Sequence, residues 1–300
     1  MKKHTLLLIG FGILSLTVLF TNAIGASRVK NPKNVSTNYE IKALKIPTGL
    51  NLAGELVPIE INSIRERLDR ELLVNTYWQS NGLLLLKRAN KYFPILEPLL
   101  KKHGIPDDFK YLAVAESGLE NNSSPAGAAG FWHFLKSSGR EYGLEINSNV
   151  DERYHLEKAT KVAADYLHKS KEKFGSWTLA AAAYNAGNGR ITKSLQKQQV
   201  DNYYDLLLNP ETGRYVFRIV ALKEILTHPQ KYGFVFDQED LYNAPKTREV
   251  QVDTTITNLT AFAKGFNMTY KELKLQNPWL RESKLNNKSR RTYQIKVLQK

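Results

Sequence analysis

Helical periodicity extends from about residue 59 to residue 232, and it constrains the fold of this chain more than any other feature. Apolar residues recur there at spacings of three and four, which places them on one face of successive helices. No convincing strand-like alternation appears in that region. The pattern predicts a mainly α-helical domain with helices over residues 60–73, 76–92, 94–103, 109–117, 156–174, 177–184 and 213–227.

A second and smaller pattern follows Pro245. Residues 249–252 and 293–297 alternate like short strands, and residues 258–264 and 270–276 between them are patterned as helices. This order predicts a small α+β unit of the βααβ type. So small a unit has a thin core, so we expect it to depend on the main domain or on a ligand for firm stability.

The N-terminus has the pattern of an export signal. Met1, Lys2 and Lys3 precede an apolar run at residues 6–20, and small residues follow it. The run is short for a membrane-spanning helix. We therefore predict a cleaved signal peptide over residues 1–26 and a location in the periplasm or cell envelope, with an uncleaved membrane anchor or peripheral membrane association as the alternative.

Two further segments lack sustained periodicity. Residues 27–58 are polar and are interpreted as a tether or loosely packed arm, which leads into a helical extension and gives an N-terminal segment of residues 27–75. Residues 233–246 are interpreted as a linker between the two domains.

Composition narrows the classes of function. The chain has no cysteine, which excludes a disulfide scaffold, a thiol nucleophile and a lipidated cysteine, so a lipoprotein is not expected. Its six histidines have no ligand-like spacing, and neither a metal nor a cofactor is expected. The net charge of +14 suits binding to an anionic cell-wall polymer or lipid surface. The alternative is that the basic residues lie on ordinary solvated helix faces and have no binding role. Because the basic residues are spread along the chain, no nucleic-acid partner is expected. A monomer is expected.

Glu116 occupies a position where an apolar residue is expected. It follows Phe109, Leu112 and Ala113 at helical spacing, just before Gly118 ends the predicted helix. Burial and the negative end of the helix dipole both disfavour an ionised carboxylate and raise its pKa. A raised pKa suits a general acid near neutral pH. The alternative is a carboxylate at the edge of the stripe that reaches solvent.

Two later segments also depart from ordinary core composition. Residues 124–134 read Ser-Pro-Ala-Gly-Ala-Ala-Gly-Phe-Trp-His-Phe. The small residues permit close packing of the backbone, and the aromatic residues suit a sugar-binding cleft. The alternative is a structural turn followed by aromatic residues of the core. Four alanines at residues 180–183 lead to Tyr184 and Asn185. The Asn185 carboxamide can both donate to and accept from an N-acetyl group, although a helix C-cap is the simpler role.

Four elements in this order resemble the lytic transglycosylase domain of the soluble-transglycosylase (SLT) type, in particular the membrane-bound lytic murein transglycosylase D group. They are Glu116-Ser117, Gly-Ala-Ala-Gly-Phe-Trp-His at residues 127–133, Ala-Tyr-Asn-Ala-Gly at 183–187, and the late Tyr215. The resemblance covers residues 76–232 and implies a lysozyme-like helical catalytic domain. Residues 247–300 resemble a degenerate LysM module, whose usual Gly-Asp-Thr opening is here Asp-Thr-Thr at residues 253–255.

The resemblance implies an enzyme that cleaves the MurNAc-β-1,4-GlcNAc bond of peptidoglycan glycan strands without water. Glu116 would protonate the glycosidic oxygen and then, once ionised, take the proton of the muramyl O6, which closes a 1,6-anhydromuramic acid end. Ser117 would orient Glu116 or the muramyl substituent, and Tyr184 and Asn185 would bind near the acetamido group. The remaining expected substrate-binding residues are Gly130, Phe131, Trp132, His133 and Tyr215.

Other functions remain open at this level. A muramidase of the goose-lysozyme kind would share the fold and use water, and a cell-wall-binding protein would retain the fold without the activity. A helical scaffold unrelated to sugar leaves the order of the motifs unexplained. Ordinary glycosidases need two carboxylates, and nothing in the sequence marks Glu120, Asp151 or Glu152 as a partner of Glu116.

His133 stands where the family usually has glutamine. Glutamine is neutral, whereas histidine titrates near neutral pH. A charged His133 would favour ionised Glu116 and weaken it as an acid. We therefore expect His133 to stay neutral.

Overall fold

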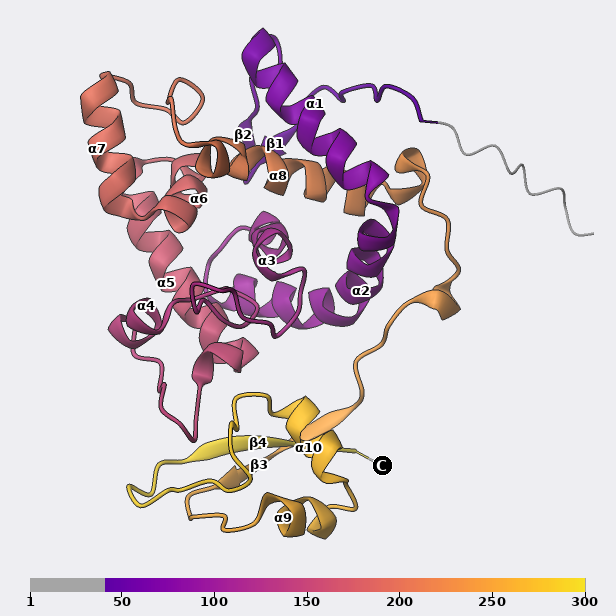
Figure 1. Ribbon diagram of the computed structural model, residues 1–300, viewed down its shortest axis with the longest axis vertical. Helices are drawn as coiled ribbons and strands as arrows, with labels where there is room; N and C mark the ends of the chain where they lie inside the picture. Colours follow the sequence, from indigo (N-terminus) through magenta and orange to yellow (C-terminus); the bar gives the residue numbers. More distant parts are fainter. Residues whose placement is uncertain (1–40, 300) are drawn as a thin grey trace, which may run out of the picture. The chain divides into compact units, whose positions relative to one another are not determined.

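The computed structural model describes residues 41–299, which fold into a helical domain and a small C-terminal α+β unit (Figure 1). Two short strands, β1 (Asn51–Leu52) and β2 (Glu55–Leu56), precede the helices. The helical domain contains α1 (Asn62–Tyr77), α2 (Gln79–Lys102), η1 (Asp107–Phe109), α3 (Lys110–Ser117), α4 (Lys136–Glu141), η2 (Glu152–Tyr154), α5 (Leu156–Phe174), α6 (Trp177–Ala186), α7 (Asn188–Gln198) and α8 (Pro210–Thr227). The segments η3 (Pro229–Tyr232) and η4 (Gln238–Asp240) lead to the C-terminal unit.

The predicted signal peptide, residues 1–26, and residues 27–40 of the predicted arm lie outside the described residues. Among residues 41–299, no helix is both long and apolar enough to cross a membrane.

Helix α3 carries Glu116 and lies at the centre of the helical domain, with α2, α5 and α8 around it (Figure 1). Phe109 and Leu112 are fully buried, so the apolar face inferred from the sequence does face the core. The helix ends at Gly118, whose φ of 61° is in the left-handed region that glycine adopts at little cost. This stop leaves Glu116 in the last turn.

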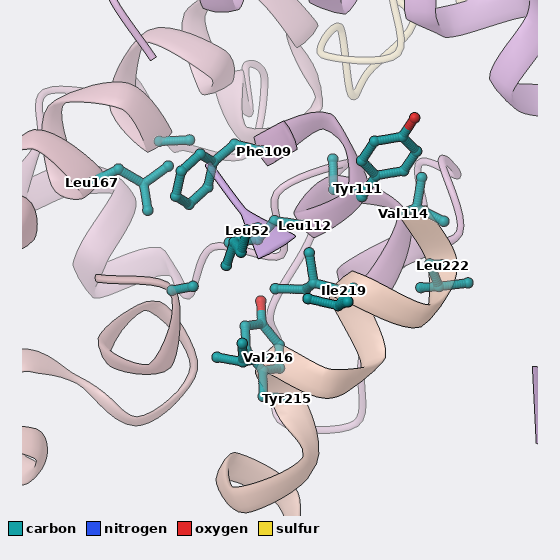
Figure 2. Close-up of a cluster of buried hydrophobic side chains, with 14 of the residues drawn as sticks. Leu52, Phe109, Tyr111, Leu112, Val114, Leu167, Tyr215, Val216, Ile219 and Leu222 are labelled. Atoms are coloured by element: carbon teal, nitrogen blue, oxygen red, sulfur yellow. The ribbon is translucent and has the colours of Figure 1, made fainter. Parts of the chain in front are cut away.

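The strands β1 and β2 form an antiparallel hairpin that packs on the core through Leu50, Leu52 and Val57, so this part of residues 27–58 is not a tether. Residues 41–48 form no helix or strand and none of them is buried, as in a loosely packed arm. Leu52 is fully buried, and Figure 2 shows it beside Leu112 of α3, with Val216 and Ile219 of α8 in the same cluster. The short strands carry too few residues for alternation to be visible in the sequence. Burial of Leu50, Leu52 and Val57, not strand propensity, fixes this segment, whereas Leu56 of β2 is exposed.

Helix α2 is continuous, and the predicted break between residues 92 and 94 is wrong. Pro94 and Pro98 lie inside it and are both exposed, whereas Leu96 and Leu100 on the opposite side are fully buried. A proline removes one backbone donor and usually breaks or bends a helix. On the exposed side, the carbonyl groups that lose their partners can bond to water, while the buried leucines hold the helix against the core.

Two helices, α4 and α7, were not predicted from the sequence. Each buries little of its surface: Gly139 is the buried residue of α4 and Ile191 that of α7. Helix α4 has no apolar side chain, so periodicity gives no signal there. In α7, Ile191 and Leu195 have helical spacing, and this short signal was missed.

The C-terminal unit confirms the predicted βααβ order. It consists of β3 (Thr247–Val252), α9 (Leu259–Gly265), α10 (Tyr270–Gln276) and β4 (Tyr293–Leu298), with β3 and β4 antiparallel and Val250 opposite Ile295. Asn277 is fully buried at the end of α10. Its side chain donates to the carbonyl of Lys296 at 2.7 Å and accepts from the same residue's amide at 2.8 Å, which fastens α10 to β4.

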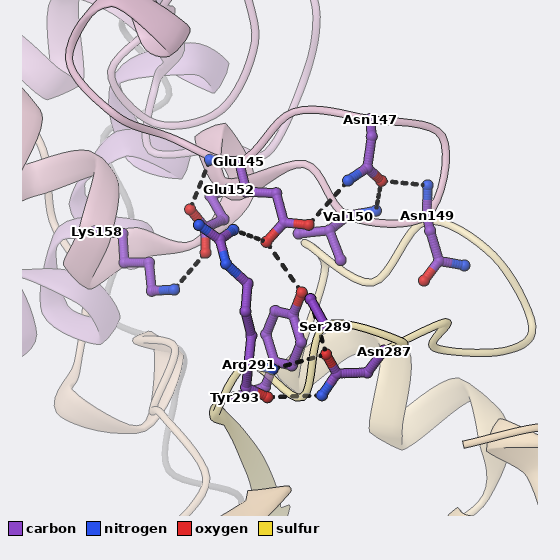
Figure 3. A network of polar contacts seen from close by, with 10 residues as sticks. All are labelled: Glu145, Asn147, Asn149, Val150, Glu152, Lys158, Asn287, Ser289, Arg291 and Tyr293. Carbon is purple, nitrogen blue, oxygen red and sulfur yellow. Dashed lines mark hydrogen bonds and ion pairs between the residues drawn. The ribbon is translucent and has the colours of Figure 1, made fainter. Parts of the chain in front are cut away.

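This unit is attached to the helical domain by the loop that precedes η2. Glu145 accepts hydrogen bonds from Arg291 (2.7 Å) and the Tyr293 hydroxyl (3.0 Å), as Figure 3 shows. The Asn149 side chain donates to the Lys284 carbonyl (2.9 Å) and accepts from the Asn286 amide (2.9 Å). These contacts satisfy polar groups on both sides of the interface. The dependence of the unit's stability on the main domain stays a prediction.

Candidate active site

Glu116 combines burial with one strong hydrogen bond. Its side chain is 16% exposed, and Oε1 accepts a hydrogen bond from the Tyr215 hydroxyl. Burial raises the pKa of Glu116 to about 7, against smaller opposing effects of Tyr215 and the Arg218 charge. Near neutral pH a substantial fraction of Glu116 is therefore protonated, as a general acid requires.

Helix α8 brings three side chains to this carboxyl group. The Asn209 side chain caps the helix by accepting from the Thr212 amide at 2.9 Å. Tyr215 lies one turn further along α8 and is buried. Glu211 lies four residues before Tyr215 and Arg218 three residues after it, so all three side chains are on the same side of the helix. Glu211 raises the pKa of Glu116 and Arg218 lowers it, after the larger effects of burial and Tyr215. Neither charge was predicted as part of the site from the sequence, although Glu211 and Arg218 both lie at helical spacing from Tyr215.

His133 is the second neighbour of Glu116. Its Nδ1 lies 3.8 Å from Oε2 of Glu116, and its Nε2 lies 2.7 Å from Oδ1 of Asn122. The Asn122 amide nitrogen donates to the Ser117 carbonyl at 3.4 Å, which leaves its oxygen to face the histidine. The hydrogen on the ring therefore belongs on Nε2, and Nδ1 presents a lone pair toward Glu116. Burial lowers the pKa of His133, the direction expected for a neutral side chain.

Tyr184 and Asn185 lie at the end of α6, whose residues Ala180–Ala183 are fully buried and allow close helix packing. The Tyr184 hydroxyl donates to the Trp132 carbonyl at 2.8 Å, which connects α6 to the loop that carries His133. Burial, and after it the Glu116 charge, raises the pKa of Tyr184. Asn185 accepts from the Thr212 hydroxyl at 2.8 Å and donates to Glu211 at 3.4 Å. Both residues thus border the Glu116 site.

The other predicted site residues are buried around it. An added Cβ at Gly130 would lie 1.9 Å from the Arg153 carbonyl oxygen, so this position requires glycine. Trp132 is fully buried and donates to Thr160 at 2.9 Å, and Phe131 packs edge-on against Tyr92.

Ser117 does not face Glu116 in this structure. It is buried, and its hydroxyl donates to the Ala113 carbonyl at 3.1 Å. Its predicted role in orienting Glu116 or the muramyl substituent therefore stays a prediction.

The three carboxylates considered as partners for Glu116 all form ion pairs with basic side chains. Glu120 pairs with Arg88, Asp151 with Arg153 at 2.7 Å, and Glu152 with Lys158. Within the described part of the chain, no cluster of three or more histidine and carboxylate side chains is arranged to hold a metal ion.

Two family models match parts of this chain. The segment from residue 93 to residue 207, which contains Glu116, His133 and Tyr184, matches the transglycosylase SLT domain. Residues 248–300 match the soluble lytic transglycosylase C-terminal LysM-like domain, which confirms the predicted pairing of the two modules and the predicted fold class.

The chain also resembles individual known proteins. Membrane-bound lytic murein transglycosylase D of Escherichia coli K12, and the same protein of E. coli O6:H1, are each 32% identical over 180 residues, which is 58% of this chain. The chain spans 39% of the length of each. An inactive variant of lytic transglycosylase Slt from Pseudomonas aeruginosa is 21% identical and covers 51% of this chain and 26% of its own, with a TM-score of 0.39.

Proposed function

We propose that this protein is a peptidoglycan lytic transglycosylase in which Glu116 is both acid and base. The observation that carries the proposal is the carboxyl group of Glu116 at the end of α3, with a pKa raised to about 7 and the Tyr215 hydroxyl donating to it. The SLT match and the similarity to lytic murein transglycosylase D support the reaction class.

The first step needs a proton on the correct oxygen. Because Tyr215 donates to Oε1, the acidic hydrogen of neutral Glu116 belongs on Oε2. His133 Nδ1 is 3.8 Å from Oε2, beyond hydrogen-bond distance, so this oxygen remains available to a substrate. Oε2 delivers its proton to the glycosidic oxygen between N-acetylmuramic acid and N-acetylglucosamine as the C1–O bond breaks.

The second step uses the ionised form of the same group. The Tyr215 hydrogen bond and the positive charge of Arg218 both favour the carboxylate, as their effect on its pKa indicates. The carboxylate takes the hydrogen of the muramyl O6 while O6 bonds to C1. The product is a 1,6-anhydromuramic acid end, no water is consumed, and Glu116 is protonated again.

The surroundings favour this single-acid route over hydrolysis with a second carboxylate. Glu120, Asp151 and Glu152 are engaged by cations, and Glu211 accepts from Asn185. Buried Trp132 and Phe131 keep the wall of the site apolar, which disfavours entry of water. In this proposal Tyr184 and Asn185 lie near the acetamido group, Ser117 orients Glu116 or the muramyl substituent, and Gly130 is part of the substrate-binding loop.

The setting of the activity is part of the proposal. The N-terminal export signal and the net charge of +14 suit a protein exported to the cell envelope, where it acts as a monomer on glycan strands. Membrane association through the N-terminal segment is the alternative to a cleaved signal peptide.

The test is mass spectrometry of fragments released from purified peptidoglycan by the wild type and by Glu116→Gln. Fragments about 18 to 20 Da lighter than their hydrolysed or reduced counterparts, absent with the variant, are the expected result. Hydrated reducing ends would assign a muramidase instead. Binding to sacculi without any fragments from the wild type would leave a binding protein.

A further inference from the structure

A pocket of about 740 Å³ lies where the LysM-like unit meets the helical domain. One wall comes from α2 and the residues after α3, including Lys91, Tyr92 and Glu120. The other comes from the C-terminal unit, including Lys274, Trp279 and Lys296. The volume is within the range of pockets that enclose a small ligand or a short peptide. The substrate-site residues described above, apart from Phe131, do not line it.

The two walls are held together by contacts other than the Glu145 network. Lys296 forms an ion pair with Glu157, and the Asp151 amide donates to the Trp279 carbonyl at 2.9 Å. The Trp279 ring stacks between His155 and Tyr293, with ring centroids 5.6 Å apart in both cases. The pocket is therefore a feature built jointly by both domains.

Its charge is positive. The lining contains four cationic side chains (Arg88, Lys91, Lys274 and Lys296) and two carboxylates, Glu120 and Glu157. Each carboxylate pairs with one cation, as Arg88–Glu120 and Lys296–Glu157. Within residues 41–299, no carboxylate lies within ion-pair distance of Lys91 or Lys274. Lys274 instead donates to backbone carbonyls, including that of Glu282 at 3.0 Å.

The remaining lining suits a peptide rather than a flat surface. Phe131, Tyr92 and Trp279 give apolar walls, and Asn121, Gln276 and Gln294 offer groups that both donate and accept. A lipid surface would require a protruding basic face, whereas this site is concave. Unpaired cations beside apolar walls and amide side chains are complementary to a short chain that carries carboxylates.

The pocket is also connected to the catalytic residue through the chain. Leu119 and Asn121 line it directly after the helix that ends with Glu116 and Ser117, and the next residue, Asn122, contacts His133. Arg88 spans both regions, because it pairs with Glu120 and donates to the Gly118 carbonyl at 3.3 Å. A ligand seated in the pocket therefore lies next to the segment that sets the position of Glu116.

We propose that this pocket binds the stem peptide carried by the muramic acid of the glycan substrate, with Lys91 and Lys274 binding its carboxylates. The proposal rests on the proposed function, because that activity supplies a substrate with acidic peptides. It makes the LysM-like unit a part of the substrate site. Peptide-bearing strands are then bound better than strands from which the peptides have been removed.

The experiment compares two substrates that differ in the peptide alone. Glycan strands are used as isolated and after an amidase has removed the stem peptides, and kcat/KM is measured on each. For the wild type, the ratio of the two values is expected to be about fivefold or more in favour of peptide-bearing strands, as for a partly exposed charge-assisted contact. Lys91→Glu is expected to bring this ratio close to one. Lys101→Glu, at the exposed end of the same helix and outside the pocket, is the control and keeps the wild-type ratio.

A second measurement does not depend on cleavage. Calorimetric titration with the tetrapeptide released by the amidase is expected to show binding to the wild type and to Lys101→Glu, and weaker binding to Lys91→Glu. Absence of peptide binding by the wild type, or a wild-type ratio of one with efficient cleavage of both substrates, overturns this inference and leaves the proposed function intact. Absence of cleavage of either substrate overturns the proposed function, and the calorimetry still decides about the pocket.

Discussion

The Tyr215 hydroxyl donates a hydrogen bond to Oε1 of Glu116 across 99 positions of sequence. After burial, this bond is the largest influence on the pKa of Glu116, and it acts downward. Tyr215 thereby limits how far burial raises the pKa and fixes which oxygen carries the proton.

Tyr215→Phe is expected to raise the pKa of Glu116 above about 7, because the donor that favours the carboxylate is lost. The acid form then persists to higher pH, so the alkaline limb of kcat/KM shifts upward by about one pH unit. Activity at the optimum falls about tenfold, since the ionised intermediate loses the same donor. The check is a pH–rate profile, with Tyr111→Phe as control, a buried tyrosine that bonds to Thr227. An unshifted alkaline limb contradicts this role.

Glu116→Gln is expected to stabilise the fold above neutral pH. The folded pKa of about 7 is higher than the ordinary value of 4.5, so the native protein binds a proton that the unfolded chain releases. The contribution of the Glu116 proton to the free energy of unfolding is therefore complete below pH 4.5 and is lost as pH rises through about 7. Above pH 8 the variant should be more stable by about 2 kcal/mol. Urea unfolding at pH 5 and pH 8 measures the difference in unfolding free energy between the variant and the wild type, with Glu66→Gln, at an exposed position, as control. The same difference at both pH values would contradict the prediction.

His133→Gln is expected to extend activity into acid. Burial lowers the pKa of His133 below its ordinary value, so the ring gains charge only in acid, and that charge favours ionised Glu116. Glutamine cannot acquire the charge. The ratio of kcat/KM, variant to wild type, should rise by about threefold or more between pH 7 and pH 5. A ratio that does not change with pH would remove His133 from the titrating groups.

Asn122→Ala tests the contact that fixes the His133 tautomer. Without the Asn122 oxygen, Nε2 loses the group that holds its hydrogen in place. Activity is expected to fall by several-fold at every pH between 5 and 8, in contrast to the pH-dependent effect of His133→Gln. The same pH–rate measurement distinguishes the two, and a wild-type profile for Asn122→Ala would show that the tautomer is held by other means.

Gly130→Ala is expected to destabilise the protein by about 3 kcal/mol or more. Its φ is 79°, and the added methyl group would overlap the Arg153 carbonyl oxygen. Gly127→Ala is a matched control in the same loop, because its φ is 82° but no atom lies within 4 Å of the added Cβ. Denaturant unfolding should therefore show a clearly larger loss for Gly130. Equal losses would mean that backbone conformation alone accounts for the effect.

Glu55→Gln is expected to destabilise α6 through its N-terminus. Glu55 accepts from the backbone amides of Trp177 (2.6 Å) and Thr178 (2.8 Å). Burial alone would raise the pKa of Glu55, but hydrogen bonds from Thr178, Ser176 and Trp177 outweigh it and hold the pKa below 4.5. The stabilisation, about 1 kcal/mol given its partial exposure, is therefore present above pH 4.5 and lost as pH falls below it. Thermal unfolding at pH 7 and pH 3 should show a difference from wild type that shrinks in acid; a constant difference would contradict the assignment.

Local pattern was enough to predict several elements. The spacing of Phe109, Leu112 and Glu116 and the stop at Gly118 predicted α3 and the buried acid at its end, and alternation predicted β3 and β4. These features depend on neighbours within a few residues, which the sequence displays directly. The break predicted at Pro94 was wrong because the packing of Leu96 and Leu100, contributed by distant helices, outweighed a local preference.

Periodicity and spacing in the sequence were enough to predict a mainly helical chain, a carboxylate in an apolar register at the end of one helix, and a βααβ unit after it. The packing of distant segments decided what surrounds that carboxyl group: the Tyr215 donor, the opposed charges of Glu211 and Arg218, and the Asn122 contact that orients His133. It also decided that the C-terminal unit shares a pocket with α2. Periodicity records which face of a helix is buried, whereas the partners on that face come from segments far apart in the chain, and their distances exist only after the helices have packed.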